Sequence, residues 1–385
     1  MKKTYIDTAM ERIAPDLILK GGNVVDVFSG RVIKADVIIK DGIICGVGSY
    51  SGENEQDVSG KYIMPGFIDS HVHIESSMTQ PSEYAKAVMP HGITTVIADP
   101  HEITNVCGED GLEFMLKSAK NIPLDVNLML PSCVPATPFE HTGANLDAKT
   151  TQKLAPKFFG IGEMMNYPGI VSGDDETLGK LCLDIIDGHA PLLSGHELDA
   201  YASAGIKTDH ECSVVEEMTE KISKGMYILL REGTLSLDVA KLIKGVTPYT
   251  LRRCAFCTDD RFVGEIIRDG SIDHCIRKAV SLGLNNIDAI IMATLNACEM
   301  YGMKNKGAIA PSYVADIVVA DDLNLSSISQ VYKNGKLVCE NGKALFECET
   351  VDNSKVTNTV HLPKISADFF KTDVKDKFDA IELIP

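Results

Sequence analysis

The sequence lacks the features of a membrane or secreted protein. No apolar run approaches the ~20 consecutive residues that a helix needs to cross a bilayer. Residues 1–7 also contain none of the apolar stretch that a secretory signal requires. We therefore expect a cytoplasmic protein that makes no contact with a membrane.

Basic residues are scarce as well. The 385 residues include 37 Lys and Arg against 54 Asp and Glu, which leaves a net charge of −17 and no basic cluster. Such a chain cannot neutralise the phosphates of a duplex, so we do not expect nucleic acid as a partner. The length and the 44% of hydrophobic residues indicate a globular protein with a large core, built as one large domain or two ordinary ones.

A second Cys-x-x-Cys pair is absent, which weakens any interpretation of the cysteines as zinc ligands. The eleven cysteines are scattered along the chain, and Cys254 and Cys257 lie in a run that alternates like a buried strand. We predict reduced thiols in the core and a structural role for this pair.

The pattern of short apolar runs predicts two kinds of structure. Between residues 16 and 65 short strands alternate with turns, and the same alternation recurs at residues 315–338. This pattern indicates a flanking β-sandwich built from both chain ends. Residues 66–307 alternate β-branched runs with helical segments over a length close to the ~250 residues of an eight-fold βα barrel. The predicted fold class is α/β, a (β/α)8 TIM-like barrel with a small flanking β-sandwich domain.

The expected elements and domains follow this division. Barrel strands are predicted at residues 67–69, 94–98, 126–130, 158–162, 185–188, 206–209, 227–230 and 255–258, and helices at residues 82–89, 111–119, 197–204, 213–223 and 287–300. The β domain is expected to comprise residues 1–65 and 308–350, the barrel residues 66–307, and the start of a further C-terminal domain residues 351–385.

Two histidines end the first expected barrel strand. His71 and His73 are i and i+2 neighbours, so in a strand both rings point to one face and can reach one metal ion. Two structural histidines explain the motif alone equally well. The other strand ends decide between these interpretations, because a βα barrel carries its chemistry there.

Further ligand-type residues stand at the ends of other expected strands. They are Glu163, His189, His210 and Asp259, which follow the fourth, fifth, sixth and eighth strands. Together with the histidine pair they make six nitrogen and oxygen ligands, which suit a pair of divalent metal ions with Glu163 as a bridge.

The blocks that follow these strands resemble the adenine deaminases of the amidohydrolase superfamily. The similar stretches are Met64-Pro-Gly-Phe-Ile-Asp-Ser-His-Val-His-Ile-Glu-Ser-Ser77 and Phe256-Cys-Thr-Asp-Asp-Arg261, with residues 91–103, 130–139, 162–166 and 187–191. The resemblance extends from about residue 16 to residue 342. It implies hydrolytic deamination of adenine by water to hypoxanthine and ammonia in purine salvage, carried out by a homo-oligomer, most simply a dimer.

The resemblance also implies roles for the ligand-type residues. The more buried of two divalent ions would be bound by His71, His73, Glu163 and Asp259, and the more exposed one by Glu163, His189 and His210. The ions would be Mn²⁺ or Fe²⁺, and Zn²⁺ also suits these ligands. Metal coordination lowers the pKa of water toward ~7, and Asp259 would take the proton as general base and return it to the departing amine as general acid.

Four residues outside the metal set are expected to bind substrate. His101 and Glu102 follow the second strand, and Arg231 and Glu232 follow the seventh. For the first pair the alternative is a helix N-cap turn, and function is favoured because polar groups on barrel loops face the site. For the second pair an internal Arg-Glu ion pair is an equal alternative.

Two other functions remain as alternatives, and one further class of deaminase is rejected. Another amidohydrolase, acting on a purine or on a cyclic amide as dihydroorotases do, is the second choice, because Glu163 stands where cyclic amidohydrolases use a carboxylated lysine. A deaminase with one zinc ion would need Pro-Cys-x-x-Cys, but Arg253 precedes Cys254. A non-catalytic homologue is the third, since the chain ends at Pro385 where adenine deaminases usually continue into a further domain.

Overall fold

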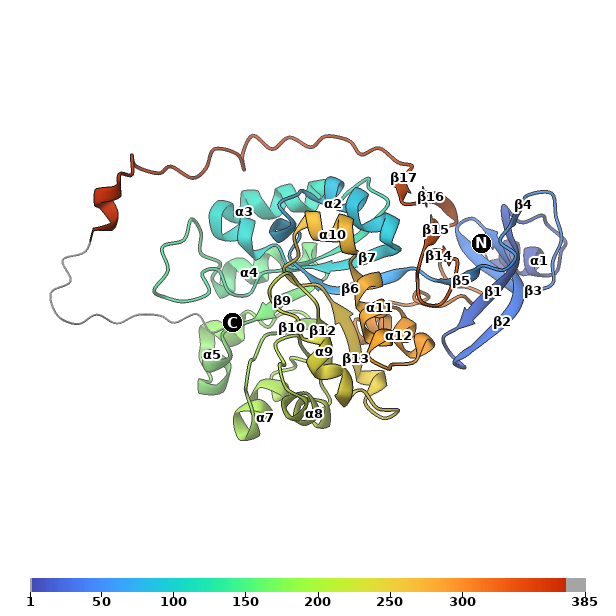
Figure 1. Ribbon diagram of the computed structural model, residues 1–385. Helices are drawn as coiled ribbons and strands as arrows, with labels where there is room; N and C mark the ends of the chain where they lie inside the picture. The colour runs from blue at the N-terminus through green and yellow to red at the C-terminus, as the bar shows by residue number, and fades with distance from the viewer. Residues whose placement is uncertain (1, 372–385) are drawn as a thin grey trace.

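The computed structural model describes residues 2–371 and shows an α/β body with a β-sheet module at its side (Figure 1). The C-terminal domain expected from the sequence includes residues 372–385, which lie outside the described residues. Within the described range, every helix is too short or too polar to cross a bilayer.

Both ends of the chain contribute strands to the β-sheet module. Its nine strands are β1 Leu17–Asp26, β2 Arg31–Lys40, β3 Ile43–Gly48, β4 Glu55–Asp57, β5 Tyr62–Pro65, β14 Ile317–Ala320, β15 Ile328–Lys333, β16 Lys336–Glu340 and β17 Lys343–Ala344. Their hydrogen-bonded order is β17-β16-β15-β14-β5-β1-β2-β3, with β4 beside β1. The N-terminal and C-terminal strands therefore meet where β14 pairs antiparallel with β5.

The sheet returns on itself around one core. The edge strand β3 meets the chain just before β14 through an antiparallel bridge between Ile43 and Val314. Side chains of β1, β2 and β14, among them Leu19, Ile39 and Ile317, pack in one buried cluster. Strands from both chain ends thus share one module, and its description as a β-sandwich stays a prediction.

Eight parallel strands form the α/β body. They are β6 Phe67–Val72, β7 Ile93–Ala98, β8 Asp125–Leu130, β9 Gly160–Met164, β10 Ile186–Gly188, β11 Thr208–Asp209, β12 Tyr227–Arg231 and β13 Cys254–Cys257. Strands β6 to β10 form one parallel sheet in chain order, and β11 to β13 form a second. The α/β class is confirmed, each strand lies within a few residues of its expected place, and complete closure into a (β/α)8 barrel stays a prediction.

A buried carboxylate joins the first and last of these strands. Asp69 of β6 is fully buried, and its Oδ1 accepts a hydrogen bond of 3.0 Å from the backbone N–H of Thr258, just after β13. Its Oδ2 accepts from the Thr258 hydroxyl. Burial raises the pKa of Asp69 to about 6, and these hydrogen bonds counteract part of that rise. The side chain of Asp69 therefore links β6 to β13, beside the parallel bridge between Val72 and Asp259.

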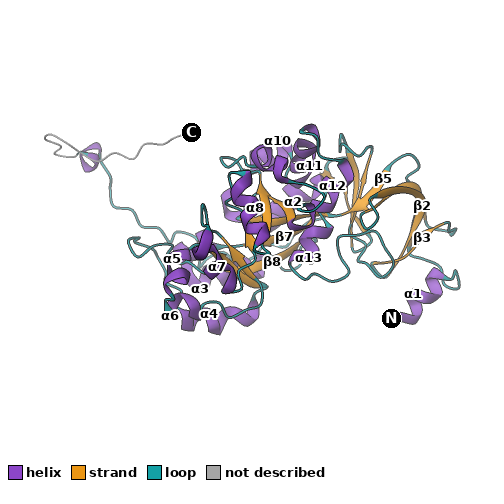
Figure 2. Ribbon diagram, turned by 90° about the horizontal axis from the view of Figure 1, so that it is seen from below, coloured by secondary structure: helices purple, strands orange, loops and turns teal. Residues whose placement is uncertain are grey.

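Helices surround the parallel strands (Figures 1 and 2). The α-helices of the described residues are α1 Lys2–Ala9, α2 Pro81–Val88, α3 His101–Ser118, α4 Ala148–Leu154, α5 Tyr167–Ser172, α6 Asp175–Gly179, α7 Gly195–Ser203, α8 Val215–Ser223, α9 Val239–Leu242, α10 Val263–Asp269, α11 Ile272–Ser281, α12 Asn286–Met292 and α13 Leu295–Met300. The longest of them, α3, contains a kink at Gly108, whose φ of 55° is not helical.

The helix expected over residues 287–300 is broken in two. Between α12 and α13 the carbonyl of Ala293 accepts a hydrogen bond of 2.9 Å from the N–H of Ile68 in β6. The next residue, Thr294, leaves the helical region with φ −138° and ψ −85°. A contact with a strand more than 200 residues earlier in the chain thus ends the helix, and the local pattern of apolar residues contains no sign of it.

The cysteines are reduced, as predicted. All eleven are free, and eight of them are buried. Cys254 and Cys257 begin and end β13, and both are fully buried, which agrees with a structural role for this pair.

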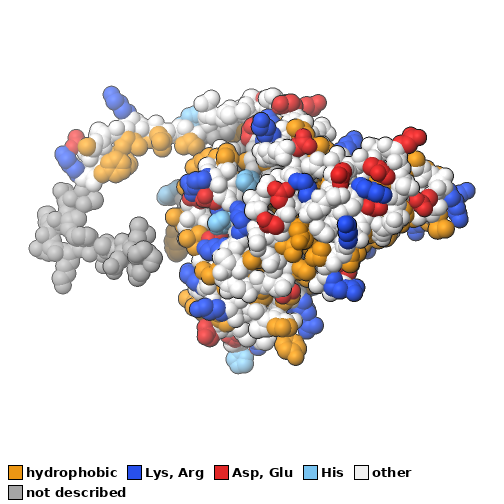
Figure 3. All heavy atoms as spheres, turned by 45° about the vertical axis from the view of Figure 1, so that its right-hand side comes forward, with side chains coloured by type: hydrophobic (Ala, Val, Ile, Leu, Met, Phe, Trp, Pro, Cys, Tyr) orange, Lys and Arg blue, Asp and Glu red, His pale blue; other side chains and the backbone are white. Residues whose placement is uncertain are grey.

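Beyond β17 the chain continues as an extended arm, residues 345–371, which passes over α2 and α3 (Figure 1). Lys355 of the arm lies 2.7 Å from Asp110 of α3. The far part exposes hydrophobic side chains, including Phe369 in the short 3₁₀ helix Ala367–Phe370 (Figure 3). The assignment of residues 351–371 to a further domain stays a prediction.

Buried ion pairs connect the α/β body to the β-sheet module. Lys333 of β15 lies 2.9 Å from each carboxylate oxygen of Asp316 and 2.9 Å from Asp125 at the start of β8. Lys306 lies 3.1 Å from Asp316 and donates to Thr95 of β7 at 2.7 Å. Since Lys333 and Asp316 are almost fully buried, each needs the other to offset the loss of its hydration.

Replacing Lys333 by Met is expected to lower the free energy of unfolding by about 3 kcal/mol, because the buried Asp316 loses its best partner. Urea denaturation followed by circular dichroism measures the change. The matched control is Lys336→Met on the neighbouring strand, where the side chain is exposed and an effect below about 0.5 kcal/mol is expected. Equal effects of the two substitutions would contradict a role for the buried pair.

Candidate metal centre

Six side chains meet at the C-terminal ends of the parallel strands. They are His71 in β6, His73 directly after β6, Glu163 in β9, His189 directly after β10, His210 directly after β11, and Asp259 two residues after β13. Their nitrogen and oxygen atoms form overlapping groups within 4.8 Å of one another. The structure thus brings together all six residues that the sequence predicts as metal ligands.

The first part of the cluster comprises His71, His73 and Asp259. The Nε2 atoms of the two histidines are 3.1 Å apart. Asp259 Oδ1 lies 3.1 Å from His73 Nε2 and 3.8 Å from His71 Nε2. All three side chains are buried, so water cannot solvate these polar atoms freely.

Glu163 connects this part of the cluster to the second. Its Oε1 lies 3.4 Å from His73 Nε2. Its Oε2 lies 2.8 Å from His189 Nδ1 and 3.1 Å from His210 Nε2. One carboxylate therefore faces histidines on both sides, which is the arrangement expected of a bridging ligand.

The remaining ring nitrogens fix the tautomers of the first two histidines. His71 Nδ1 lies 2.9 Å from Asp187 Oδ2, and His73 Nδ1 lies 2.8 Å from the carbonyl oxygen of Asp99. Because a carbonyl oxygen only accepts, His73 must donate from Nδ1. The carboxylate of Asp187 favours the same tautomer of His71. In neutral rings both Nε2 atoms then carry lone pairs that face each other and nearby carboxylate oxygens.

Such a group of lone pairs requires positive charge between its members. Burial by itself would lower the pKa of His71, but the hydrogen bond to Asp187 and the charges of Asp187 and Glu163 raise it to about 9. Burial likewise opposes a charged His73, yet Glu102, Asp259 and Glu163 raise its pKa well above the ordinary value. Divalent cations supply this charge and accept nitrogen and oxygen ligands, so the residues present fit them.

Asp259 adopts an unusual backbone conformation. Its φ is 57°, in the left-handed region that non-glycine residues seldom occupy. Its N–H donates to the carbonyl of His71 at 3.0 Å, and its own carbonyl accepts from His73 N–H at 3.2 Å. These two hydrogen bonds stabilise the strained residue and hold its carboxylate beside the histidine pair.

A buried lysine, Lys221, stabilises the backbone beside His189 and His210. Lys221 of α8 is fully buried, and its Nζ lies 2.6 Å from the carbonyl oxygen of Ala190, 2.7 Å from Glu217 and 3.1 Å from Asp209. Asp209 in turn accepts from Ala190 N–H at 2.9 Å. Because Ala190 follows His189 and Asp209 precedes His210, this network fixes the backbone beside both histidines.

His101 and Glu102 lie beside the cluster, at the start of α3. His101 Nδ1 is 3.2 Å from Glu163 Oε1, and Glu102 Oε2 is 3.7 Å from His73 Nδ1. The helix has Pro100 at its N-cap and no side-chain capping bond, so neither residue acts as a cap. The carboxylate of Asp99, just before Pro100, accepts a hydrogen bond of 2.9 Å from the backbone N–H of Glu163.

Arg231 and Glu232, the second predicted pair of substrate-binding residues, point in different directions. Arg231 reaches the cluster, with Nη1 2.9 Å from Asp259 Oδ2. Glu232 turns away, and its carboxylate pairs with Lys278 of α11. The two do not form the internal Arg-Glu pair considered from the sequence. Their contact with substrate stays a prediction.

Two acidic residues of the site were not singled out from the sequence. Asp187 orients His71 from β10, and Glu211 lies 3.5 Å from His210 Nε2 and 3.7 Å from His189 Nδ1. Each is close to a predicted ligand in the chain, since Asp187 precedes His189 by two residues and Glu211 follows His210. That proximity was the available signal for both.

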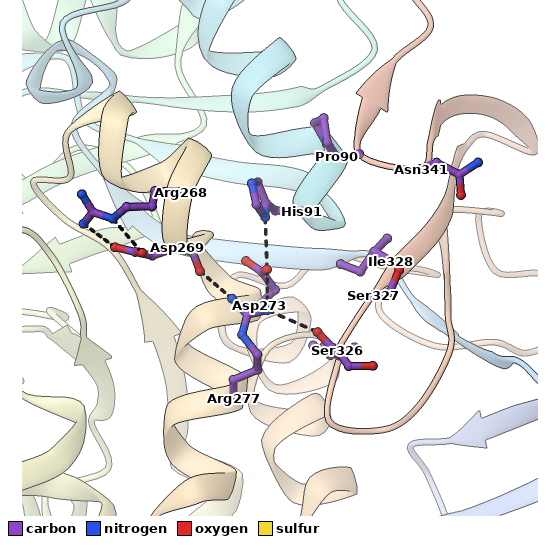
Figure 4. A pocket seen from close by; sticks show the side chains of 12 residues that line it. Pro90, His91, Arg268, Asp269, Asp273, Arg277, Ser326, Ser327, Ile328 and Asn341 are labelled. Carbon is purple, nitrogen blue, oxygen red and sulfur yellow. Dashed lines mark hydrogen bonds and ion pairs between the residues drawn. The ribbon is translucent and has the colours of Figure 1, made fainter.

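A separate pocket of about 450 Å³ lies between the end of α2, helices α10 and α11, and the loop before β15 (Figure 4). Its ionisable side chains pair with one another: His91 Nδ1 lies 3.1 Å from Asp273, and Arg268 pairs with Asp269. Among the described residues that line it, none belongs to the six-residue cluster. Its charges are thus largely balanced within the pocket.

Comparison with known proteins identifies close relatives. The sequence model of the family described as "Amidohydrolase family" matches residues 62–338 of this chain. The adenine deaminase of Clostridium acetobutylicum is 50% identical over 369 residues, which cover 94% of this chain and 65% of that protein. Adenine deaminase 2 of Desulfotalea psychrophila is 47% identical over 391 residues, which cover 100% of this chain and 68% of that protein. The chain therefore spans about two thirds of the length of these curated relatives.

Solved structures share the fold at lower identity. An enamidase, described as a member of the amidohydrolase superfamily, has a TM-score of 0.64 at 18% identity and covers 86% of this chain and 97% of its own. A β-aspartyl dipeptidase from Fervidobacterium islandicum has a TM-score of 0.61 at 20% identity, with 87% and 99% covered. At these identities the likeness concerns the fold alone.

Replacing Glu163 by Gln is expected to reduce the Mn²⁺ bound per chain to less than half of the parent's value, because the carboxylate faces histidines on both sides. Elemental analysis after dialysis measures the metal. His196→Gln is the matched control, since His196 on α7 is fully exposed and lies outside the cluster. A Glu163→Gln protein that retains the parent's metal content would refute the assignment.

Proposed function

Because the chain belongs to the amidohydrolase family, and within it to the adenine deaminases, we propose that it hydrolyses adenine to hypoxanthine and ammonia. The observation that carries the proposal is the convergence of four histidines with Glu163 and Asp259 in one buried cluster. Ligands for divalent ions beside a carboxylate that can transfer a proton are what hydrolysis of this kind requires.

The proposed cofactor is a pair of divalent ions, Mn²⁺ or Fe²⁺, with Zn²⁺ as an alternative. One ion would be held by His71, His73, Glu163 and Asp259, and the other by Glu163, His189 and His210. When bound, such ions lower the pKa of coordinated water to about 7 and so make a nucleophile available at neutral pH.

Asp259 is the proposed general base and acid. Its Oδ1 faces the histidine pair, while its Oδ2 is occupied by Arg231. Oδ1 would take a proton from the attacking water as the new C–O bond forms at C6 of adenine, and deliver it to the amino group as the C–N bond breaks. Ammonia then leaves. The hydroxyl on C6 gives up its remaining proton, which restores the group that protonated the ring nitrogen, and the product is hypoxanthine.

We propose that His101 and Glu102 serve the purine ring. They stand at the start of α3, next to His73, and Glu102 Oε2 is buried without a hydrogen-bond partner. Attack at C6 needs a proton on a ring nitrogen, since adenine is poorly electrophilic. We assign this proton delivery, or a direct hydrogen bond to the ring, to the pair.

Other features of the proposal rest on the relatives and the sequence. The chain covers 65% of the C. acetobutylicum protein, so the activity of the whole relative comes to this chain as a proposal. A role in purine salvage, a cytoplasmic location, a homodimer and domain boundaries after residues 65, 307 and 350 belong to it as well.

Asp259→Asn is expected to lower kcat for ammonia release from adenine by about 10²- to 10⁴-fold, because the amide cannot take the proton from water. A coupled ammonia assay on Mn²⁺-loaded protein measures the rate. His196→Gln, on the exposed face of α7, should retain the parent's rate. The proposal fails if the parent releases no ammonia from adenine, or if Asp259→Asn is as fast as the parent.

A further inference from the structure

The guanidinium of Arg231 donates hydrogen bonds to three carboxylates. Its Nε and Nη2 each lie 3.2 Å from Asp238 Oδ2, and Nη2 also lies 3.3 Å from Glu211 Oε2. Its Nη1 donates to Glu211 Oε1 and, at 2.9 Å, to Asp259 Oδ2. These are five hydrogen bonds, and an arginine side chain has five N–H donors. Every donor therefore has a partner, and a contact with substrate would have to break one of these bonds.

The three partners differ in their relation to the metal centre. Asp259 is a proposed ligand, and Glu211 lies within 3.7 Å of two others, His189 and His210. Asp238 stands apart from the cluster and is anchored by its own N–H, which donates to the carbonyl of Arg231 at 2.9 Å. The guanidinium thus lies between an anchor on its outer side and two carboxylates of the centre on its inner side.

This placement controls how many oxygens reach the centre. Asp259 Oδ2 is bound by Arg231, so Oδ1 alone faces the histidine pair. Glu211 would otherwise be a free carboxylate beside His189 and His210, able to act as a seventh ligand. Without the guanidinium, the two inner carboxylates would also repel each other in a buried site.

We infer that Arg231 is a positioning residue: it holds Asp259 as a one-oxygen ligand and keeps Glu211 from coordinating a metal ion. The inference rests on the proposed function, which assigns Asp259 and the histidines to the metal ions. In this arrangement Asp238 anchors the guanidinium of Arg231, and the guanidinium in turn restrains the carboxylate of Glu211.

The test compares Arg231→Ala, Asp238→Asn and the control Lys241→Met in full-length protein. Lys241 lies 3.0 Å from the outer oxygen of Asp238 and is 57% exposed, so its loss should leave the centre unchanged. The absorption spectrum of bound Co²⁺ reports the ligand set, and Mn²⁺ titration reports affinity. Both readouts are independent of deaminase activity.

We expect Arg231→Ala to change the Co²⁺ spectrum and to weaken Mn²⁺ binding by about 10- to 100-fold. Added guanidinium should restore the parent's spectrum, since it refills the same place between the carboxylates. Asp238→Asn should change the Co²⁺ spectrum and the Mn²⁺ affinity in the same direction, but by a smaller amount. If Arg231→Ala does not fold, Asp238→Asn tests the positioning role of Arg231 in its place.

The inference is overturned if Co²⁺ spectrum and Mn²⁺ affinity stay at the parent's values in Arg231→Ala, or in Asp238→Asn where the alanine variant is unfolded. A rise in KM for adenine without a spectral change would instead indicate a substrate contact. If the parent releases no ammonia from adenine, the proposed function fails, whereas the metal readouts still decide the role of Arg231.

Discussion

His71 and His73 face each other through Nε2 atoms only 3.1 Å apart, and each ring has already engaged its other nitrogen, His73 with a carbonyl oxygen and His71 with a carboxylate. Two lone pairs at this distance, with Asp259 Oδ1 and Glu163 Oε1 beside them, are stable only if positive charge lies among them. Protons could supply it at a cost, as the raised pKa of His71 indicates. Divalent ions supply it without burying charged imidazolium rings, and the need for that charge explains why these side chains were brought to the ends of five different strands.

The surrounding structure holds this group of like-charged and electron-rich atoms in place. Asp187 orients His71, Lys221 fixes the backbone beside His189 and His210, and the left-handed conformation of Asp259 is stabilised by backbone hydrogen bonds to β6. Arg231 occupies the remaining gap, between Asp259 and Glu211. Each of these groups is buried and paired, so the free energy that the centre costs in an unloaded protein is distributed over many contacts rather than concentrated in one.

The meeting of the six cluster residues could be predicted because each of them ends a short apolar run, and the ends of parallel strands meet at one face of the body. The contacts of the residues around the cluster could not be predicted, because their partners are distant in the chain. Asp187 pairs with His71 across 116 residues, and Glu232 turns to Lys278 across 46. The same holds for the fold: the eight strands were visible as local patterns, whereas the break at Ala293 comes from a hydrogen bond to β6. Local sequence determines which residues stand at a strand end, and tertiary contacts determine which way they turn.

We propose that Glu163 lies between two divalent ions. Anomalous scattering at the manganese edge, from crystals of the protein loaded with Mn²⁺, locates these ions. We expect two peaks about 3.5–4 Å apart on either side of the Glu163 carboxylate, one beside His71 and His73 and the other beside His189 and His210. A single peak, or two peaks that do not share Glu163, would contradict it.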